Sequence, residues 1–510
     1  MFYKLRKQGM DNNLWRILIN MYEGFMCSVR VRNKLSSWFN ASQGVHQGAP
    51  WSMKLFILMH NELIQQLKQS GQGLCIMIEN TTSPTFADDI ALVTLHKRCM
   101  QVLLDIAYRY SRQWRFHFNA SKSEVIIFGQ DKCSSTNLRL GDSVIVAVDV
   151  TKHMGVCLAN SDKLKVQYVD GKILNSKCKV FATIGLGNER IPTSINVASR
   201  LYWTSILPSL LHGVETADYP DAAQANLEQF HGQSAKYFQN LPLQSPNVSC
   251  LATIGWKSME SHINILMLTF LWRLLLLPMN CVYKRVVLIR LWYHMYVVDG
   301  KHQGPTWNML QRFREYGLIG ILSDVMNTGY VMPIQEFKRL VHNLVINNEL
   351  KRYKISCHLY SSLKLFKNCI PNIKMWPWWL FCLKNPKATR NVRTLLRIMC
   401  GRSELRSDKI KFGAISNVCY KCDLNVMDSI THVVFECPES EIMRQNLMRE
   451  VAEVAPPLLN NHFQMMPNYN KTLFLLSGLN DAYVCEWDLM YHAMLNLVIV
   501  MYNQYVLNVP

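Results

Sequence analysis

Two adjacent carboxylates, Asp88 and Asp89, stand between apolar residues early in the chain. Phe86-Ala87 precedes the pair and Ile90-Ala91-Leu92 follows it, so a tight hairpin would lift both acids to the edge of a sheet. Phosphoryl transfer needs hard oxygen ligands that hold divalent ions against an attacking 3′ oxygen and a leaving pyrophosphate. The pair is therefore a candidate Mg²⁺ site, although aspartate also favours ordinary solvated turns.

A second set of candidate ligands lies near the C-terminus, in the pattern Cys419-x2-Cys422-x9-His432-x4-Cys437. Three thiolates and one imidazole at this spacing are typical of a structural Zn²⁺ site. Four protein ligands close the coordination sphere, so the zinc would stabilise the fold rather than take part in a reaction. The alternative is four unligated residues, because a chain with 16 cysteines forms some pairs by chance.

Two further segments carry groups that suit nucleotides or phosphates. Gln47 and Gly48 lie in a glycine-flanked loop that opens a predicted helix, where backbone and amide groups can approach a nucleotide or template base. The same loop could equally be a plain helix entry. Arg390, Arg393 and Arg397 share one helical face at 3-4 spacing, which suits a row of phosphates, and a solvated helix face is the alternative.

Composition favours a folded chain with an anionic partner. Of the 510 residues, 49% are hydrophobic and 18% are charged, which excludes a wholly disordered chain. Lys and Arg total 55 against 36 Asp and Glu, a net charge of +19. Such an excess suits a partner with many phosphates, although a membrane surface would also attract it.

No export signal or membrane span is apparent in the sequence. The most apolar stretch, Ile263–Leu277, contains Arg273 and ends before Pro278, so it is shorter than the roughly 20 residues that a spanning helix needs. We expect a buried helix there. Most cysteines stand alone in apolar contexts, which favours reduced thiols and an intracellular protein, nuclear or cytoplasmic and not secreted.

The periodicity predicts an α+β unit followed by a mostly helical region. The expected helices include Asn13–Tyr22, Lys54–Lys68 and one carrying Leu103, Ala107, Tyr110 and Trp114 at 4-3-4 spacing. Short strands are expected at Leu74–Ile78, Thr85–Ala87, Ile90–Val93 and Val125–Phe128, in a largely antiparallel sheet. Beyond Gly171 helices predominate, with breaks expected at Pro208, Pro220, Pro242 and Pro278 and a late helix at Glu439–Val454.

The order of these segments resembles the reverse transcriptases of non-LTR (LINE-type) retrotransposons. The residues that carry the resemblance are Gly44-Val45-x-Gln47-Gly48-x-Pro50-x-Ser52-x-x-Leu55-Phe56, Phe86-Ala87-Asp88-Asp89, Asn119-Ala-Ser-Lys122, Lys152-His153-Met154-Gly155-Val156, and Leu201-Tyr202-Trp203 through Pro208 to Glu215. The resemblance covers residues 1 to about 220, is weak from 220 to 390, and returns at Leu395–Gly401 and the Cys/His cluster.

The resemblance implies roles for particular residues. Asp88 and Asp89 would be catalytic and hold Mg²⁺, and Lys122 would lie near the incoming triphosphate. Gln47, Gly48, Phe86 and Ala87 would position nucleotide and template, while His153, Met154 and Gly155 would grip the primer end. The zinc knuckle would help to hold RNA or target DNA. The implied partners are an RNA template, a DNA primer or target, and dNTP.

The sequence also departs from the family. Trp51 and Met53 stand where the family usually has Leu and Pro. The third metal-binding aspartate of the family is expected before a segment like Phe2–Gly9, and Asp11 is expected to be a loop or helix-cap residue rather than its substitute. We therefore predict an N-terminally truncated enzyme that does not polymerise alone. The alternatives are a non-catalytic RNA- or DNA-binding protein derived from such an element, and an inert relic.

The expected organisation follows a right-hand polymerase. Residues 1–160 would form partial fingers and palm, an antiparallel sheet with helices, and residues 161–245 the end of the palm and a helical thumb. A helical region (246–400), a CCHC zinc knuckle (401–445) and a C-terminal helical tail (446–510) would follow. The sequence gives no indication of oligomeric state.

Overall fold

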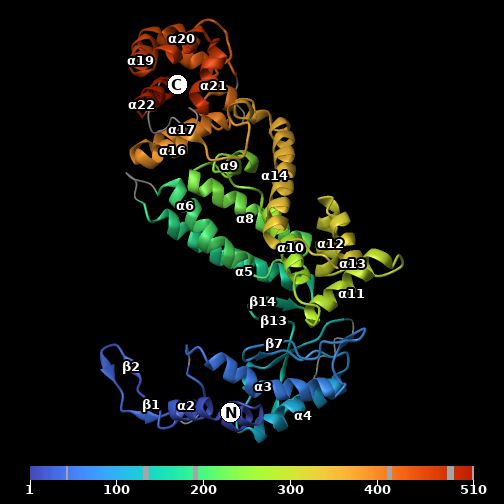
Figure 1. The fold of residues 1–510 in the computed structure, drawn as a ribbon. Coiled ribbons are helices and arrows are strands. Elements are labelled where there is room, and N and C mark those ends of the chain that lie inside the picture. The colour runs from blue at the N-terminus through green and yellow to red at the C-terminus, as the bar shows by residue number, and fades with distance from the viewer. Residues whose placement is uncertain are drawn as a thin grey trace. The chain divides into compact units, whose positions relative to one another are not determined.

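The computed structural model describes residues 1–41, 44–46, 48–129, 137–187, 193–409, 416–478 and 488–507. The chain forms two compact units (Figure 1). The first comprises Met1–Leu164 and Leu277–Arg290, and the second comprises Lys165–Leu276 and Leu291–Pro510.

The first unit combines helices with short strands. Its helical segments are α1 (Phe2–Lys7), α2 (Asn12–Tyr22), α3 (Ser52–Gln69), α4 (Lys97–Gln113) and the 3-10 turn η1 (Ala120–Lys122). Its strands are β1 (Met26–Cys27), β2 (Arg30–Val31), β3 (Lys34–Leu35), β4 (Phe39–Asn40), β5 (Cys75–Ile76), β6 (Glu79–Asn80), β7 (Thr85–Phe86), β8 (Asp89–Ile90), β9 (Glu124–Ile126), β10 (Arg139–Leu140), β11 (Ser143–Val144), β12 (Val146–Val148), β13 (Val150–His153) and β14 (Val156–Ala159).

The strands pair two by two. Within the described ranges, β9 and β12 are parallel and the other pairs are antiparallel. Main-chain hydrogen bonds from Leu74 to Val93 (2.9 Å) and from Val93 to Thr82 (2.8 Å) connect the β5–β6 hairpin to the β7–β8 hairpin. The predicted mixture of helices and strands is confirmed. The expected sheet is divided into small ladders, and each strand is only two to four residues long.

Helix α4 supplies the core of the first unit. Leu103, Ala107 and Tyr110 are buried as their spacing predicts, and they pack against Leu63 and Leu67 of α3. Leu104, on the adjoining face of α4, packs in a second cluster whose other buried members are Leu138, Leu140 and Ile145. Burying such a side chain stabilises a fold by about 1.5–3 kcal/mol, so this helix holds the strands around it.

The second unit is helical. Its helices are α5 (Asp162–Ile184), α6 (Ile195–Leu201), α7 (Leu207–Leu211), α8 (Asp221–Gln239), α9 (Asn247–Ala252), α10 (Met259–Leu275), α11 (Val282–Tyr296), α12 (Pro305–Glu315), α13 (Ile319–Thr328), α14 (Ile334–Leu359), α15 (Phe366–Cys369), α16 (Pro377–Lys384), α17 (Thr389–Met399), α18 (Arg406–Lys409), α19 (Glu441–Val454), α20 (Pro457–Met465), α21 (Asn468–Ser477) and α22 (Asp488–Leu507). Both α5 and α11 include residues assigned to the first unit. Shorter 3-10 turns are η3 (Ser361–Leu363), η4 (Pro386–Ala388) and η7 (Pro438–Ser440), and π-helical turns are η2 (Tyr202–Ile206) and η6 (His432–Glu436).

Three of the four expected proline breaks are confirmed. Pro220 is the N-cap of α8, Pro242 follows the end of α8, and Pro278 follows α10. The break expected at Pro208 is wrong, because α6, η2 and α7 run on from Ile195 to Leu211. Proline offers no N–H to the preceding turn, and the widened π-helical turn just before Pro208 accommodates it.

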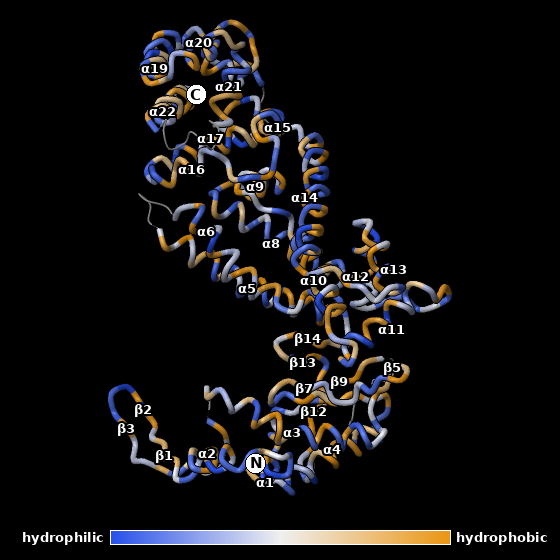
Figure 2. Tube along the Cα trace, viewed as in Figure 1, coloured by the Kyte–Doolittle hydropathy of each residue, from blue (hydrophilic) through white to orange (hydrophobic). Residues whose placement is uncertain are grey.

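Aromatic side chains form much of the second unit's core. Trp272 of α10 stacks on Phe337 of α14 with ring centroids 4.0 Å apart, which confirms the buried helix predicted there. Trp376, Trp378 and Trp379 are buried too, and the Trp378 indole donates to the Leu475 carbonyl (3.2 Å). Hydrophilic and hydrophobic residues are interspersed along the helices (Figure 2). No helix in the described part of the chain is long and apolar enough to cross a membrane.

A buried histidine ties α8 to this core. His231 lies against the ring of Trp256 with centroids 5.1 Å apart, its Nδ1 is 2.8 Å from the Tyr202 hydroxyl, and its Nε2 is 2.9 Å from the Lys257 carbonyl. The neutral ring satisfies both contacts, since Nε2–H donates to the carbonyl and Nδ1 accepts from the hydroxyl. Burial lowers the pKa of His231 to about 4.

Protonation of His231 should therefore destabilise the fold at acid pH. The pKa of His231 in the folded state lies below the ordinary value of about 6.5. The stability that the neutral ring contributes is therefore complete above about pH 6.5 and is lost as pH falls towards 4. Between about pH 7.5 and pH 5 we expect wild type to lose about 2 kcal/mol more unfolding free energy than His231→Gln. Denaturant unfolding at both pH values measures this, and parallel losses in the two proteins would contradict it.

Candidate functional sites

The two candidate catalytic aspartates lie at the tip of the β7–β8 hairpin. Phe86 pairs with Asp89, which leaves Ala87 and Asp88 as the turn, and Ala87 has a φ of +52°. Such a tight turn requires positive φ, and the small side chain of alanine limits its cost. Both aspartates are exposed, and neither forms an ion pair with any other described residue. Their carboxylates are therefore available to a cation.

The hairpin is anchored on α4. Ile90 and Leu92, which follow the aspartates, pack against the buried cluster that α3 and α4 share. Leu92 also joins the second cluster, together with Ala120 and Val125. Because those two residues flank Lys122, the same helix supports both the hairpin and the Lys122 segment.

Lys122 is exposed at the end of η1, where Asn119 accepts a hydrogen bond from the Ser121 N–H (3.1 Å) and fixes the turn. The carboxylates of Asp88 and Asp89 and the amine of Lys122 therefore reach solvent from elements that the apolar clusters around α4 hold in place.

The expected primer-grip residues form another tight turn. His153 pairs with Val156 across β13 and β14, and Met154 and Gly155 between them have φ values of +53° and +76°. Thr151 of β13 donates to the Glu124 carboxylate (2.5 Å), two residues beyond Lys122. The structure thus brings the β13–β14 hairpin beside the Lys122 segment.

Gly48 has a φ of +84°, a conformation that favours glycine, in the loop before α3. Gln47 lies outside the described residues. The His46 carbonyl accepts from the Ser52 hydroxyl (2.5 Å), and the His46 ring lies 4.5 Å from that of Tyr22 and 3.9 Å from that of Phe25. The loop is therefore held against the end of α2 and the segment that follows it.

Asp11 is the N-cap of α2, as predicted. Its carboxylate accepts from the backbone N–H groups of Asn13 (2.9 Å) and Leu14 (3.2 Å). Over the residues that the structure describes, Asp88 and Asp89 belong to no group of three or more side chains placed to hold a metal ion. The hairpin therefore presents two carboxylates and no third ligand.

The Cys/His cluster, by contrast, is assembled and buried. The ligand atoms of Cys419, Cys422, His432 and Cys437 all lie within 4.8 Å of one another, and the Cys422 sulfur is 3.4 Å from Nε2 of His432. These separations and this donor set fit one tetrahedral zinc ion. A short hairpin, with Val418 opposite Met427, carries the first two cysteines, and the π-helical turn η6 carries the histidine.

The surroundings of the cluster position its ligands. Glu436 lies 3.9 Å from the outer nitrogen, Nδ1, of His432, and the Tyr505 hydroxyl lies 3.6 Å from the Cys419 sulfur. Burial raises the pKa of Cys437 to about 12. A bound cation would reverse that effect, because a coordinated thiol is deprotonated. The sequence offered no signal for Tyr505, which is far from the cluster along the chain.

Two of the three candidate phosphate-binding arginines contact the protein itself. Arg393 donates to the Phe238 carbonyl (3.2 Å) and Arg397 to the Asn240 carbonyl (2.9 Å), where α8 ends. Arg390 is exposed on the same helix, α17. Cationic side chains at a helix C-terminus satisfy carbonyls that lack partners. Phosphate binding by this row stays a prediction.

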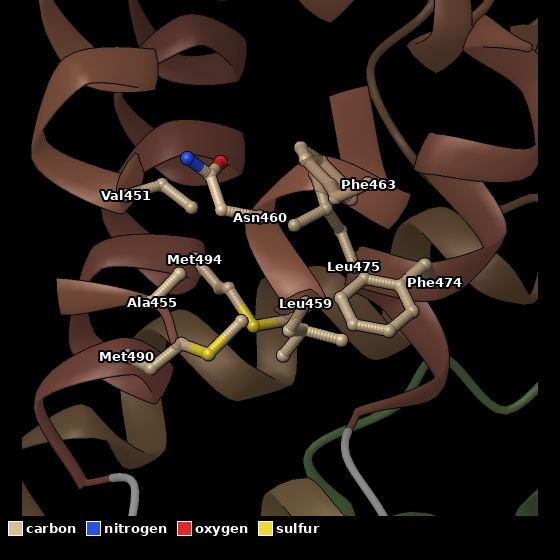
Figure 3. Close-up of a pocket in the computed structure, with 9 residues that line it drawn as sticks. All are labelled: Val451, Ala455, Leu459, Asn460, Phe463, Phe474, Leu475, Met490 and Met494. Carbon is tan, nitrogen blue, oxygen red and sulfur yellow. The ribbon is translucent and has the colours of Figure 1, made fainter. Parts of the chain in front are cut away.

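An apolar crevice lies within the second unit (Figure 3). It is lined by Val451, Ala455, Leu459, Asn460, Phe463, Phe474, Leu475, Met490 and Met494. The lining contains no acid, base or nucleophile, so the crevice offers no catalytic chemistry.

Comparison with known proteins defines the class of the first part of the chain. Residues 1–169 match the family described as reverse transcriptase (RNA-dependent DNA polymerase). This region, which contains the aspartate hairpin, Lys122 and the β13–β14 turn, is a reverse transcriptase domain.

A named relative is the retrovirus-related Pol polyprotein from type-2 retrotransposable element R2DM of Drosophila melanogaster. It is 25% identical over 254 residues, which cover 48% of this chain and 23% of the relative. The chain is thus distantly homologous to the Pol protein of an R2 non-LTR retrotransposon, and this similarity spans about a quarter of that protein's length.

The cluster geometry predicts about one zinc ion per chain. We expect Cys422→Ser to lose the metal, because serine supplies no thiolate, while Cys178→Ser, at an exposed cysteine outside the cluster, retains it. Elemental analysis of the purified, folded proteins measures the content. Folded wild type without zinc would contradict the assignment.

The arginine contacts predict separate effects for neighbouring positions. Arg390→Ala should leave the unfolding free energy unchanged. It should lower by about one the number of ions released on nucleic-acid binding, which the slope of log affinity against log salt concentration measures. Arg393→Ala should lower the unfolding free energy by about 1–3 kcal/mol, because it removes a donor from a helix-end carbonyl. Salt-titrated binding and denaturant unfolding measure the two effects. Wild-type binding by Arg390→Ala at every salt concentration would refute the phosphate role.

Proposed function

We propose that this chain provides the palm and thumb of an RNA-directed DNA polymerase from a non-LTR retrotransposon. The observation that carries the proposal is the β7–β8 hairpin, which presents two exposed carboxylates within a region that matches the reverse transcriptase family. Its partners would be an RNA template, a DNA primer or target, and dNTP.

We propose a role for each candidate residue. Asp88 and Asp89 would hold Mg²⁺, which supplies charge to stabilise the attacking and leaving oxygens of the transfer. Lys122, held on the same core, would offset the charge of the triphosphate. Gln47, Gly48, Phe86 and Ala87 would position nucleotide and template. His153, Met154 and Gly155 would contact the primer end.

The described residues lack one part of this machinery. Asp11 caps α2, and no third carboxylate is grouped with the hairpin among the described residues. Phosphoryl transfer depends on positioned charge, and loss of one such element costs about 10²–10³ in rate. We therefore propose that these 510 residues, by themselves, do not extend a primer.

A second candidate function is nucleic-acid binding without polymerisation, which the β2–β3 hairpin favours. Every residue from Arg30 to Asn40 is exposed, including the aromatic rings of Trp38 and Phe39 and three basic side chains. No acidic residue occurs between Glu23 and Glu62. Cations with exposed aromatic rings are what single-stranded nucleic acids bind, through phosphates and stacked bases.

The Cys/His cluster would contribute as a structural zinc knuckle. Its ligands are buried and would close the coordination sphere, so it would shape the C-terminal surface rather than act on a substrate. The knuckle would then help to hold RNA or target DNA.

Primer extension on an RNA template with Mg²⁺ tests the proposal. We expect no extension by the purified chain, together with single-stranded nucleic-acid binding that weakens steeply as salt rises.

Asp88→Ala is the control that separates catalysis from binding, and it should bind as wild type does. Extension by wild type that Asp88→Ala abolishes would show that this chain completes the metal site from its own residues. Absence of salt-dependent binding would instead overturn both candidate functions.

A further inference from the structure

The C-terminal helix ends against the candidate zinc ligands. Helix α22 is buried over most of its length and contacts α17, α19, α21 and η6 in the second unit. Its last turn carries Gln504 and Tyr505. The ring of Tyr505 is buried, so its hydroxyl needs a partner within the protein.

Three consecutive residues of the Cys-x2-Cys loop contact this last turn. The Tyr505 hydroxyl donates to the Cys419 sulfur (3.6 Å). The Tyr420 hydroxyl donates to the Tyr505 carbonyl, and the Lys421 ammonium donates to the Gln504 carbonyl (2.9 Å). The rings of Tyr420 and Tyr505 lie 4.8 Å apart. The loop therefore caps the C-terminus of α22, and α22 supplies a donor to the loop's first thiolate.

The chemistry of the two partners makes this contact sensitive to the metal. A site of three thiolates and one imidazole around Zn²⁺ carries a net negative charge, which sulfur-directed donors stabilise. Docking of α22 also fixes the Cys-x2-Cys loop in the position in which Cys419 meets the other three ligands. Binding of the ion and docking of the helix therefore stabilise each other.

We propose that Tyr505 is a positioning residue for the zinc site, and that zinc binding holds α22 in place through it. This inference rests on the proposed zinc site. It assigns the chain's last helix to the knuckle, although the two are separated along the sequence by α19, α20 and α21.

Tyr505→Phe tests the proposal in the full chain, with Tyr502→Phe as the matched control. Tyr502 lies one turn earlier on α22, and its hydroxyl accepts from the Glu404 N–H (2.8 Å). Competition with a chromogenic chelator should show zinc affinity about 10–100-fold weaker for Tyr505→Phe and about equal to wild type for Tyr502→Phe. In the Co²⁺-substituted proteins, Tyr505→Phe alone should shift the thiolate-to-metal charge-transfer band.

A measurement on wild type keeps the proposal testable if Tyr505→Phe fails to fold. Zinc removal should speed amide hydrogen exchange in residues 500–507 more than in α10, which lies elsewhere in the second unit. Unchanged exchange there, or equal affinities and spectra for the two variants, would overturn the role of Tyr505 while leaving the zinc site intact. Wild type that binds no zinc would overturn the zinc site itself.

Discussion

The packing of α4 against α3 is the interaction on which the first unit depends. Two adjoining faces of one helix bury separate apolar clusters, and strands only two to four residues long gain their order from those clusters rather than from a continuous sheet. An isolated two-stranded hairpin is marginally stable in water. The aspartate hairpin and the Lys122 segment are fixed because residues beside them, Leu92 and Val125, share the second cluster.

The second unit is held by a different set of interactions, in which polar groups complete an apolar core. Arg393 and Arg397 satisfy carbonyls where α8 ends, and the His231 ring joins the Tyr202 hydroxyl to the Lys257 carbonyl. The Cys/His cluster lies within the same unit, so a bound ion would stabilise the helices that bury it as well as the knuckle.

Local patterns in the sequence predicted those features that depend on neighbouring residues. The 4-3-4 spacing on α4 and the Asp11 cap could both be predicted, because each follows from periodicity or residue type. The spacing of the cysteines and histidine likewise predicted that these four side chains gather at one place.

Features that depend on contacts between residues far apart in the sequence could not be predicted from it. The row of arginines on α17 gave no sign that the end of α8 lies beside two of them, and nothing in the spacing linked Tyr505 to Cys419. The break predicted at Pro208 is wrong because the π-helical turn that accommodates this proline has no simple sequence signature.

We propose that one core holds the aspartate hairpin and the Lys122 segment as parts of a single nucleotide site. Paramagnetic broadening by Mn²⁺ with dNTP, read on the methyl groups of Ile90 and Ala120, tests it most directly. We expect both signals to broaden together, and neither to do so when Asp88 and Asp89 are replaced by Asn. Broadening of neither signal in wild type, or broadening that persists in the double variant, would contradict it.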